Sequence, residues 1–101
     1  MRDRSTLQTL LEETLGNENV YFQPPPDTQM SYPAIVYNRE NPVVRHANNS
    51  PYQQVKGYEV TVISSNPDSV IPDRVASLPM CSFQRAFETN GFNHTVFTLY
   101  F

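Results

Sequence analysis

The dipeptide Asn90-Gly91 constrains this chain more than any other feature, because it stands between two long segments of strand-forming residues. Asn and Gly both adopt positive φ at low cost, so the pair favours the tight turn of a two-residue β-hairpin. The two arms are predicted to be Cys81 to Glu88 and Asn93 to Phe101. The chain is therefore expected to end in an antiparallel pair of strands.

The turn also predicts the register of the two arms. Counting outward from it places Cys81 opposite Tyr100, and Phe83, Arg85 and Phe87 then share one face of the first arm. The second arm carries bulky groups on both faces, so we expect it to be central in a sheet or covered by a partner. Four large side chains of the hairpin are assigned to the core: Phe83, Phe87, Phe97 and Leu99.

Two short helices are predicted. From Ser5 to Leu15, leucines recur with the 3.6-residue period of one helix face. A second helix is expected to begin near Ser69 or later, because Pro72 fits only the first turn, and to end before Pro79. The leucines of the first helix and the apolar residues of the second define the faces expected to be buried: Leu7, Leu10, Leu11 and Leu15, and Ile71, Val75 and Leu78.

Three further strands are predicted upstream of the second helix. They are a brief one within Asn19 to Gln23, a stronger one from Tyr32 to Arg39, and a long one within Tyr52 to Ser64, in which Gly57 is a candidate bulge. Strands joined by loops and hairpins, with helices outside a βαβ alternation, indicate the α+β class. We expect a mainly antiparallel, four- to five-stranded sheet with both helices on one face, formed by a single domain over residues 1–101.

Two polar loops separate these elements, and they are the candidate contact surfaces. Gln23 to Ser31 contains three consecutive prolines, and Glu40 to Pro51 is long for so small a domain. Aromatic side chains beside such loops offer rigid contact area, and nearby basic side chains can add weak electrostatic attraction. The predicted interface residues are Tyr21, Phe22, Pro25, Tyr32, Arg39, Arg45, His46 and Tyr52.

Composition and charge exclude several kinds of function. The 101 residues carry 7 Lys and Arg against 10 Asp and Glu, a net charge of -3, which gives no electrostatic footprint for tight nucleic-acid binding. No apolar run approaches the roughly 20 residues that cross a bilayer, and no signal-peptide pattern is present, so neither membrane insertion nor secretion is expected. Only 3 glycines occur, and they form no phosphate-cradling loop.

Few residues could support catalysis. The two histidines, His46 and His94, lie far apart in the sequence and lack Cys, Asp or Glu at metal-ligand spacing. The single cysteine, Cys81, cannot form an internal disulfide and is interpreted as a small apolar strand residue. We therefore expect no enzyme, metal or cofactor. A small hydrolase or nucleic-acid binder that uses Cys81 and the histidines is the rival hypothesis.

Five segments carry a resemblance to a known family. In order, they are a Tyr-Pro strand, a central Tyr-rich strand, an Asn-Pro-Asp-Ser turn with a short helix, a Leu-Pro-Met-Cys-Ser-Phe segment, and a final strand; their residues are Tyr32–Tyr37, Gly57–Val62, Asn66–Ser69, Leu78–Phe83 and Asn93–Tyr100. The succession resembles the small tail terminator, or tail-completion, proteins of long-tailed bacteriophages and prophages. It departs from them in its short first helix, which leads soon into the prolines.

The resemblance implies a structural virion protein located at the phage tail and neck and assembled in the host cytoplasm. Its subunits would form a homo-oligomeric, hexameric ring on the tail tube, end tube polymerisation and present a docking surface to the neck of the capsid. The implied partners are the tail tube protein and a neck or head-closure protein, with DNA passing through the ring without specific binding. A head-closure or head–tail joining protein is the alternative within the neck. No individual functional residue is transferred by the resemblance.

Overall fold

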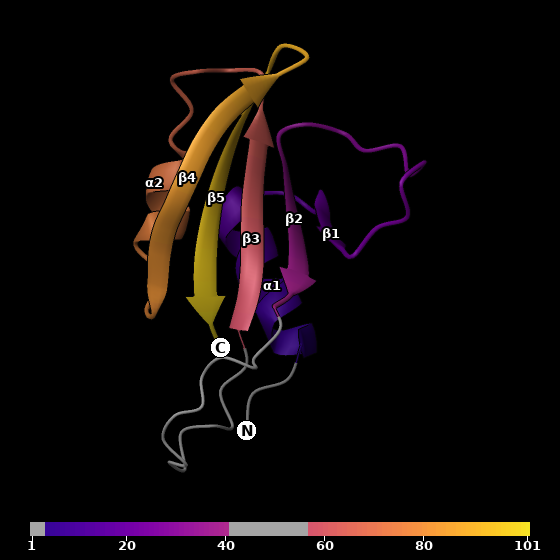
Figure 1. Cartoon of the computed structure of the whole chain (residues 1–101). Helices are drawn as coiled ribbons and strands as arrows, with labels where there is room; N and C mark the ends of the chain where they lie inside the picture. The colour runs from indigo at the N-terminus through magenta and orange to yellow at the C-terminus, as the bar shows by residue number, and fades with distance from the viewer. Residues whose placement is uncertain (1–3, 41–56) are drawn as a thin grey trace.

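The fold is a five-stranded sheet with two helices against one side of it, as Figure 1 shows. The structure, a computed structural model, describes residues 4–40 and 57–101. Its elements in chain order are α1 (Arg4–Leu15), β1 (Val20–Phe22), β2 (Ala34–Arg39), β3 (Gly57–Ser64), α2 (Ile71–Ala76), β4 (Cys81–Thr89) and β5 (Phe92–Tyr100). The predicted α+β class, the number of strands and the placing of both helices on one face are confirmed.

The strands follow the order β1-β2-β3-β5-β4 across the sheet. Every neighbouring pair is antiparallel except β1 and β2, which run parallel. The C-terminal hairpin thus brings β5 into the interior of the sheet, between β3 and β4. This position confirms that the last strand is central, and it leaves β4 at one edge.

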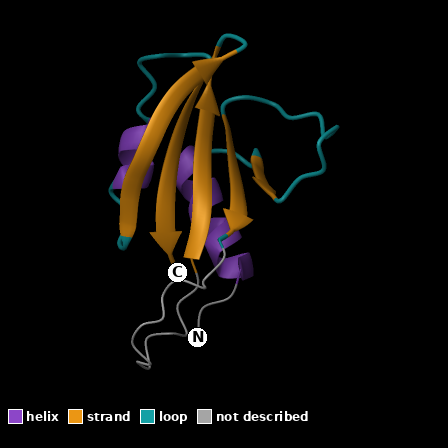
Figure 2. Ribbon diagram, viewed as in Figure 1, coloured by secondary structure: helices purple, strands orange, loops and turns teal. Residues whose placement is uncertain are grey.

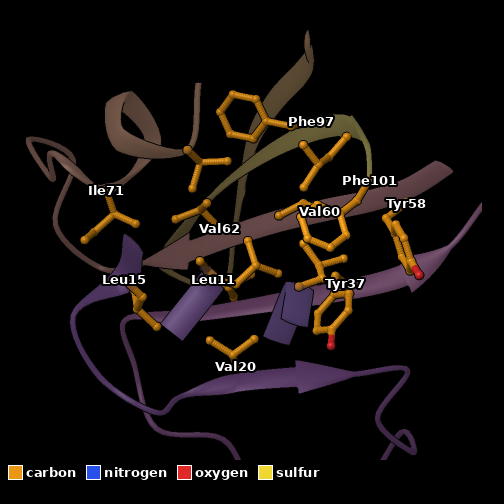
Figure 3. Close-up of a cluster of buried hydrophobic side chains, with 14 residues drawn as sticks. Leu11, Leu15, Val20, Tyr37, Tyr58, Val60, Val62, Ile71, Phe97 and Phe101 are labelled. Atoms are coloured by element: carbon orange, nitrogen blue, oxygen red, sulfur yellow. The ribbon is translucent and has the colours of Figure 1, made fainter. Parts of the chain in front are cut away.

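The core lies between the helices and the sheet face that they cover (Figures 2 and 3). In α1 the periodic leucines Leu7, Leu11 and Leu15 are buried, as the 3.6-residue pattern predicts, while Leu10 packs beside them at the margin. In α2 the first turn accommodates Pro72, as predicted. The covered face of the sheet supplies most of the other buried side chains: Val20, Ile35, Tyr37, Tyr58, Val60, Val62, Phe97 and Leu99.

The predicted hairpin register is correct near the turn and wrong farther from it. Phe87 pairs with His94, as expected, but the register shifts between Phe83 and Arg85. Gln84 is the extra residue of this β-bulge, so Cys81 lies opposite Leu99 and not opposite Tyr100. A one-residue shift reverses the faces of a strand.

The bulge also corrects the prediction that three side chains of the first arm share one face. Phe83 lies opposite Phe97 and therefore on the helix-covered side of the sheet. Arg85 and Phe87, which lie beyond the bulge, belong to the other side, which we call the open face. The two phenylalanines of β4 thus lie on opposite faces of the sheet.

The assignment of these two phenylalanines to the core is wrong as well. Phe97 and Leu99 are buried, as predicted, but Phe83 and Phe87 are exposed. The physical reason is the position of β4, which has a neighbouring strand on one side only, so its side chains extend beyond the area that the helices cover.

Some of the remaining predictions concern described residues, and others concern residues that the structure does not describe. β3 pairs with β5 without interruption from Gly57 to Ser64, so the bulge predicted at Gly57 is wrong. Gln23 to Ser31 contains no helix or strand, as expected of a loop. The segments 41–51 and 52–56 of the predicted long loop and long strand lie outside the described residues.

Candidate interaction surface

Four of the predicted interface residues lie on or beside β1. Tyr21 is half-exposed, and its hydroxyl accepts a hydrogen bond from the Ser31 amide at 3.3 Å, which ties the two ends of the proline loop together. Pro25 is exposed within that loop. Phe22 and Arg39 lie close by on adjacent strands, and Gln23 links them, because its Oε1 accepts the Arg39 amide hydrogen at 3.1 Å.

Phe22 and Arg39 already have partners within the chain. The ring of Phe22 lies 5.0 Å from that of Tyr37 and has the guanidinium of Arg4 above it at 4.4 Å. The guanidinium of Arg39 lies 5.8 Å from the centre of the Tyr58 ring. Phe22 is partly buried against the core, whereas Arg39 is exposed.

A polar cluster joins α1 to the sheet below this region. The hydroxyl of Tyr37 donates to Gln8 Oε1 at 2.6 Å, and the amide nitrogen of Gln8 donates to Glu12 at 3.0 Å and to the Val20 carbonyl at 3.1 Å. Burial raises the pKa of Tyr37 above its usual value, and the nearby guanidinium of Arg4 opposes that rise. The cluster fixes the helix against β1 and β2, so we interpret it as structural.

Tyr32 lies apart from the other predicted residues. It precedes β2 at the opposite end of that strand from Arg39, and its exposed ring contacts Phe92 with 4.4 Å between the ring centres. The structure therefore does not bring all the predicted residues into one site. Arg45, His46 and Tyr52 lie outside the described residues.

Three of the large exposed apolar side chains lie on β4 and just before it, where the sequence analysis did not expect them. Met80 is 60% exposed, Phe83 61% and Phe87 43%, and every residue from Ser82 to Thr89 is exposed. We call Met80 together with β4 the β4 surface. Large apolar side chains that are exposed along one edge of a sheet are a candidate contact surface.

The open face continues this surface toward the middle of the sheet. The ring of Phe87 stacks on that of His94 at 4.8 Å, with 10° between the ring planes. Arg85 lies 3.9 Å from Glu59 on β3, and Gln84 donates a hydrogen bond to the hydroxyl of Thr98 on β5. Aromatic and paired polar side chains therefore extend from the edge strand onto the neighbouring strands.

A difference between the two arms of the hairpin could have indicated this surface. The first arm contains Ser82, Gln84, Arg85 and Glu88, whereas the residues from Val96 to Phe101 are mostly apolar. A polar arm beside an apolar arm is typical of an edge strand beside a central one. The large phenylalanines concealed this signal because aromatic strand residues are buried by default.

A hollow of about 320 Å³ lies at the hairpin end of the molecule, between the segment after β3 and the hairpin. Its lining includes Ser64, Ser69 and His94. The hydroxyl of Ser64 accepts the Asn66 amide hydrogen, that of Ser69 accepts the Ile71 amide hydrogen, and Nδ1 of His94 lies 3.2 Å from the Phe92 carbonyl. These groups serve local turns and the hairpin.

Cys81 and the acidic residues give no further chemistry in the part of the chain that the structure describes. Burial raises the pKa of the Cys81 thiol, which disfavours the reactive thiolate near neutral pH. Within residues 4–40 and 57–101, no group of three or more His, Cys, Asp or Glu side chains could hold a metal ion. Neither described helix is long and apolar enough to cross a membrane.

Comparison with known proteins adds no further assignment. No protein-family model, no curated protein and no solved structure matches this chain. We take the β4 surface, with the adjoining open face, as the candidate functional site, because it carries exposed apolar side chains beside an aromatic stack and an ion pair.

Proposed function

We propose that this chain is a structural virion protein, a tail terminator whose copies form a ring on the end of a phage tail tube. In this role it ends the polymerisation of the tube and presents a docking surface for the neck of the capsid. The proposed partners are further copies of the chain in a hexameric ring, the tail tube protein, and a neck or head-closure protein.

The β4 surface carries the proposal. A chain of 101 residues buries a modest fraction of its surface, so exposed aromatic side chains are costly unless an assembled partner covers them. Met80, Phe83 and Phe87 provide such a surface on a rigid element rather than on a loop. Assembly into a ring requires contact patches of this kind on every copy.

The order of the elements supports the proposal too. After α1 and β1, a Tyr-Pro strand, a central strand, a short helix and a C-terminal hairpin follow one another in the structure, as in the succession of segments that resembles the family. The hairpin is the longest continuous element pair, with nine residues in each arm. It is thus the part of the fold best suited to present a contact surface to another subunit.

Charge agrees with a ring through which DNA passes. The chain has a net charge of -3, and Glu18, Asp27, Asp68 and Asp73 are exposed. Specific retention of DNA needs clustered Lys and Arg side chains that neutralise phosphates. An acidic subunit would repel the moving genome and so would not hold it in the channel.

The test is a polymerisation assay with the tube protein encoded in the same genome. Tubes are grown with increasing amounts of this chain, and their lengths are measured by electron microscopy. We expect growth to stop and mean length to fall as the chain is added, whereas an unrelated acidic protein of equal size leaves the lengths unchanged. Unaltered tube lengths with no protein bound at the tube ends would refute the proposed function.

A further inference from the structure

We propose that a second copy of this chain covers the β4 surface, so that β4 forms the contact between neighbouring subunits. The inference rests on the proposed function, which it makes more specific by naming the surface used in the ring. Four observations support it: the positions of the two phenylalanines, the features of the two edge strands that disfavour pairing with another strand, the exposed apolar area of β4, and the charge of β4.

The bulge at Gln84 places one phenylalanine on each side of the sheet edge. Phe83 lies on the helix-covered side, where its ring meets that of Phe97 edge-on at 6.1 Å. Phe87 lies on the open face against His94. A partner that covers both rings must therefore enclose the edge of the sheet from its two sides.

A continuous sheet between copies does not explain these features. The opposite edge, β1, is already occupied at its first residue, because the Val20 amide donates to the Glu18 carbonyl at 2.8 Å and the Val20 carbonyl accepts from Gln8 at 3.1 Å. On β4, the bulge and the charge of Arg85 both disfavour the addition of a strand. The contact is therefore made by side chains.

The area available on β4 suits a subunit contact. At 61% and 43% exposure, the two phenylalanine side chains together offer about 150–250 Å² of apolar surface. Met80 and the other exposed residues of β4 surround them. A stable interface buries roughly 800 Å² on each partner. Because the two phenylalanines supply only part of that area, the neighbour has to cover the adjoining residues on both sides of the edge, whereas a single bound peptide strand would leave one of the two faces uncovered.

The charge of the surface favours a second copy over a nucleic acid. β4 carries one positive residue, Arg85, and one negative residue, Glu88, and Arg85 already has Glu59 beside it at 3.9 Å. A surface without net charge does not repel a neighbouring copy, whose contacting patch in a ring is a different one. A nucleic acid would require a row of cations, which this strand does not have.

The experiment compares the oligomeric state of the full chain with that of single variants by sedimentation velocity. Phe83→Asp and Phe87→Asp each place a charge in the proposed contact, and Val70→Asp is the matched control, because Val70 is 54% exposed and lies outside β4. We expect the wild-type chain and the control to sediment as the same closed oligomer, and each phenylalanine variant to sediment as a monomer. Circular dichroism and thermal unfolding establish that the variants fold; if either unfolds, Phe83→Ser and Phe87→Ser replace them.

Two results would overturn the inference: a wild-type chain that is monomeric at every concentration and on tail tubes, or phenylalanine variants that keep the wild-type oligomer. The tube assay separates this inference from the proposed function. Loss of the oligomer in both variants, with no capping of tubes by the wild type, would support the contact and refute the function. Capping by variants that remain oligomeric would refute the contact and support the function.

Discussion

Phe83 and Phe97 face each other across the hairpin, yet one is exposed and the other is buried. Their ring centres are 6.1 Å apart, and their environments differ because β5 is flanked by two strands whereas β4 is flanked by one. Residue type alone therefore does not determine which of the two stabilises the core. The position of the strand in the sheet decides it.

Replacing each of these phenylalanines by alanine should separate the two roles. Phe97→Ala removes a side chain that is 2% exposed and should lower the free energy of unfolding by about 3–5 kcal/mol. Phe83→Ala should lower it by less than about 1 kcal/mol, since most of that ring is in solvent. Urea unfolding measures both changes at protein concentrations low enough for the wild type and both variants to be monomers, and equal losses would contradict the placement of β4 at the sheet edge.

Tyr37 illustrates a buried polar group whose partner lies far away in sequence. Its hydroxyl donates to Gln8 Oε1 at 2.6 Å, so Tyr37→Phe leaves a partly buried acceptor without this donor. We expect a loss of about 1–3 kcal/mol in the free energy of unfolding. The control is Tyr21→Phe, which removes an exposed hydroxyl and should change stability by less than about 0.5 kcal/mol. Urea titrations in which Tyr37→Phe is as stable as the wild type would show that the cluster under α1 contributes nothing.

At the scale of elements, local patterns predicted most of the fold. The leucine spacing predicted α1, the position of Pro72 predicted the start of α2, and Asn90-Gly91 predicted the terminal hairpin. These signals are local, because each depends on residues that lie close to one another in the sequence. The parallel pairing of β1 with β2 depends on contacts between distant segments, and no local pattern indicates it.

The bulge in β4 could not be predicted either, because it also depends on contacts with other strands. The turn fixes the register only nearby, and Gln84 is accommodated through contacts with other strands, including its hydrogen bond to Thr98. A single inserted residue then changed the face of Phe83 and the partner of Cys81. The candidate site was therefore harder to predict than the fold, because the exposure of Phe83 and Phe87 follows from strand order and from this bulge.

The turn itself gives an element-scale prediction. Asn90 and Gly91 have φ of 54° and 80°, and a Cβ on Gly91 would meet no other atom. Gly91→Ala should therefore cost about 1–2 kcal/mol of stability through backbone strain alone. Asn90→Gly, which also allows positive φ, should stay within about 1 kcal/mol of the wild type. Thermal unfolding of the two variants checks this, and a Gly91→Ala protein as stable as the wild type would contradict the assigned turn.

At the scale of the whole molecule, the described residues form two layers with unequal surfaces. Both helices lie on one face of the sheet (Figure 2), and the residues of β4 at its edge are exposed. The sequence analysis placed the contact residues mainly beside the polar loops. The structure adds a second region on the hairpin, separated from Tyr21 and Arg39 by the width of the sheet. Two separated contact regions are what a ring subunit needs in order to meet two neighbours.

Electron microscopy of the purified protein mixed with tail tubes tests the central claim most directly. We expect a closed ring with six-fold symmetry at one end of each tube, with the subunit fitting the density so that β4 lies at the boundary between copies. Tubes whose two ends are bare, together with a chain that remains monomeric in the same mixture, would contradict the account.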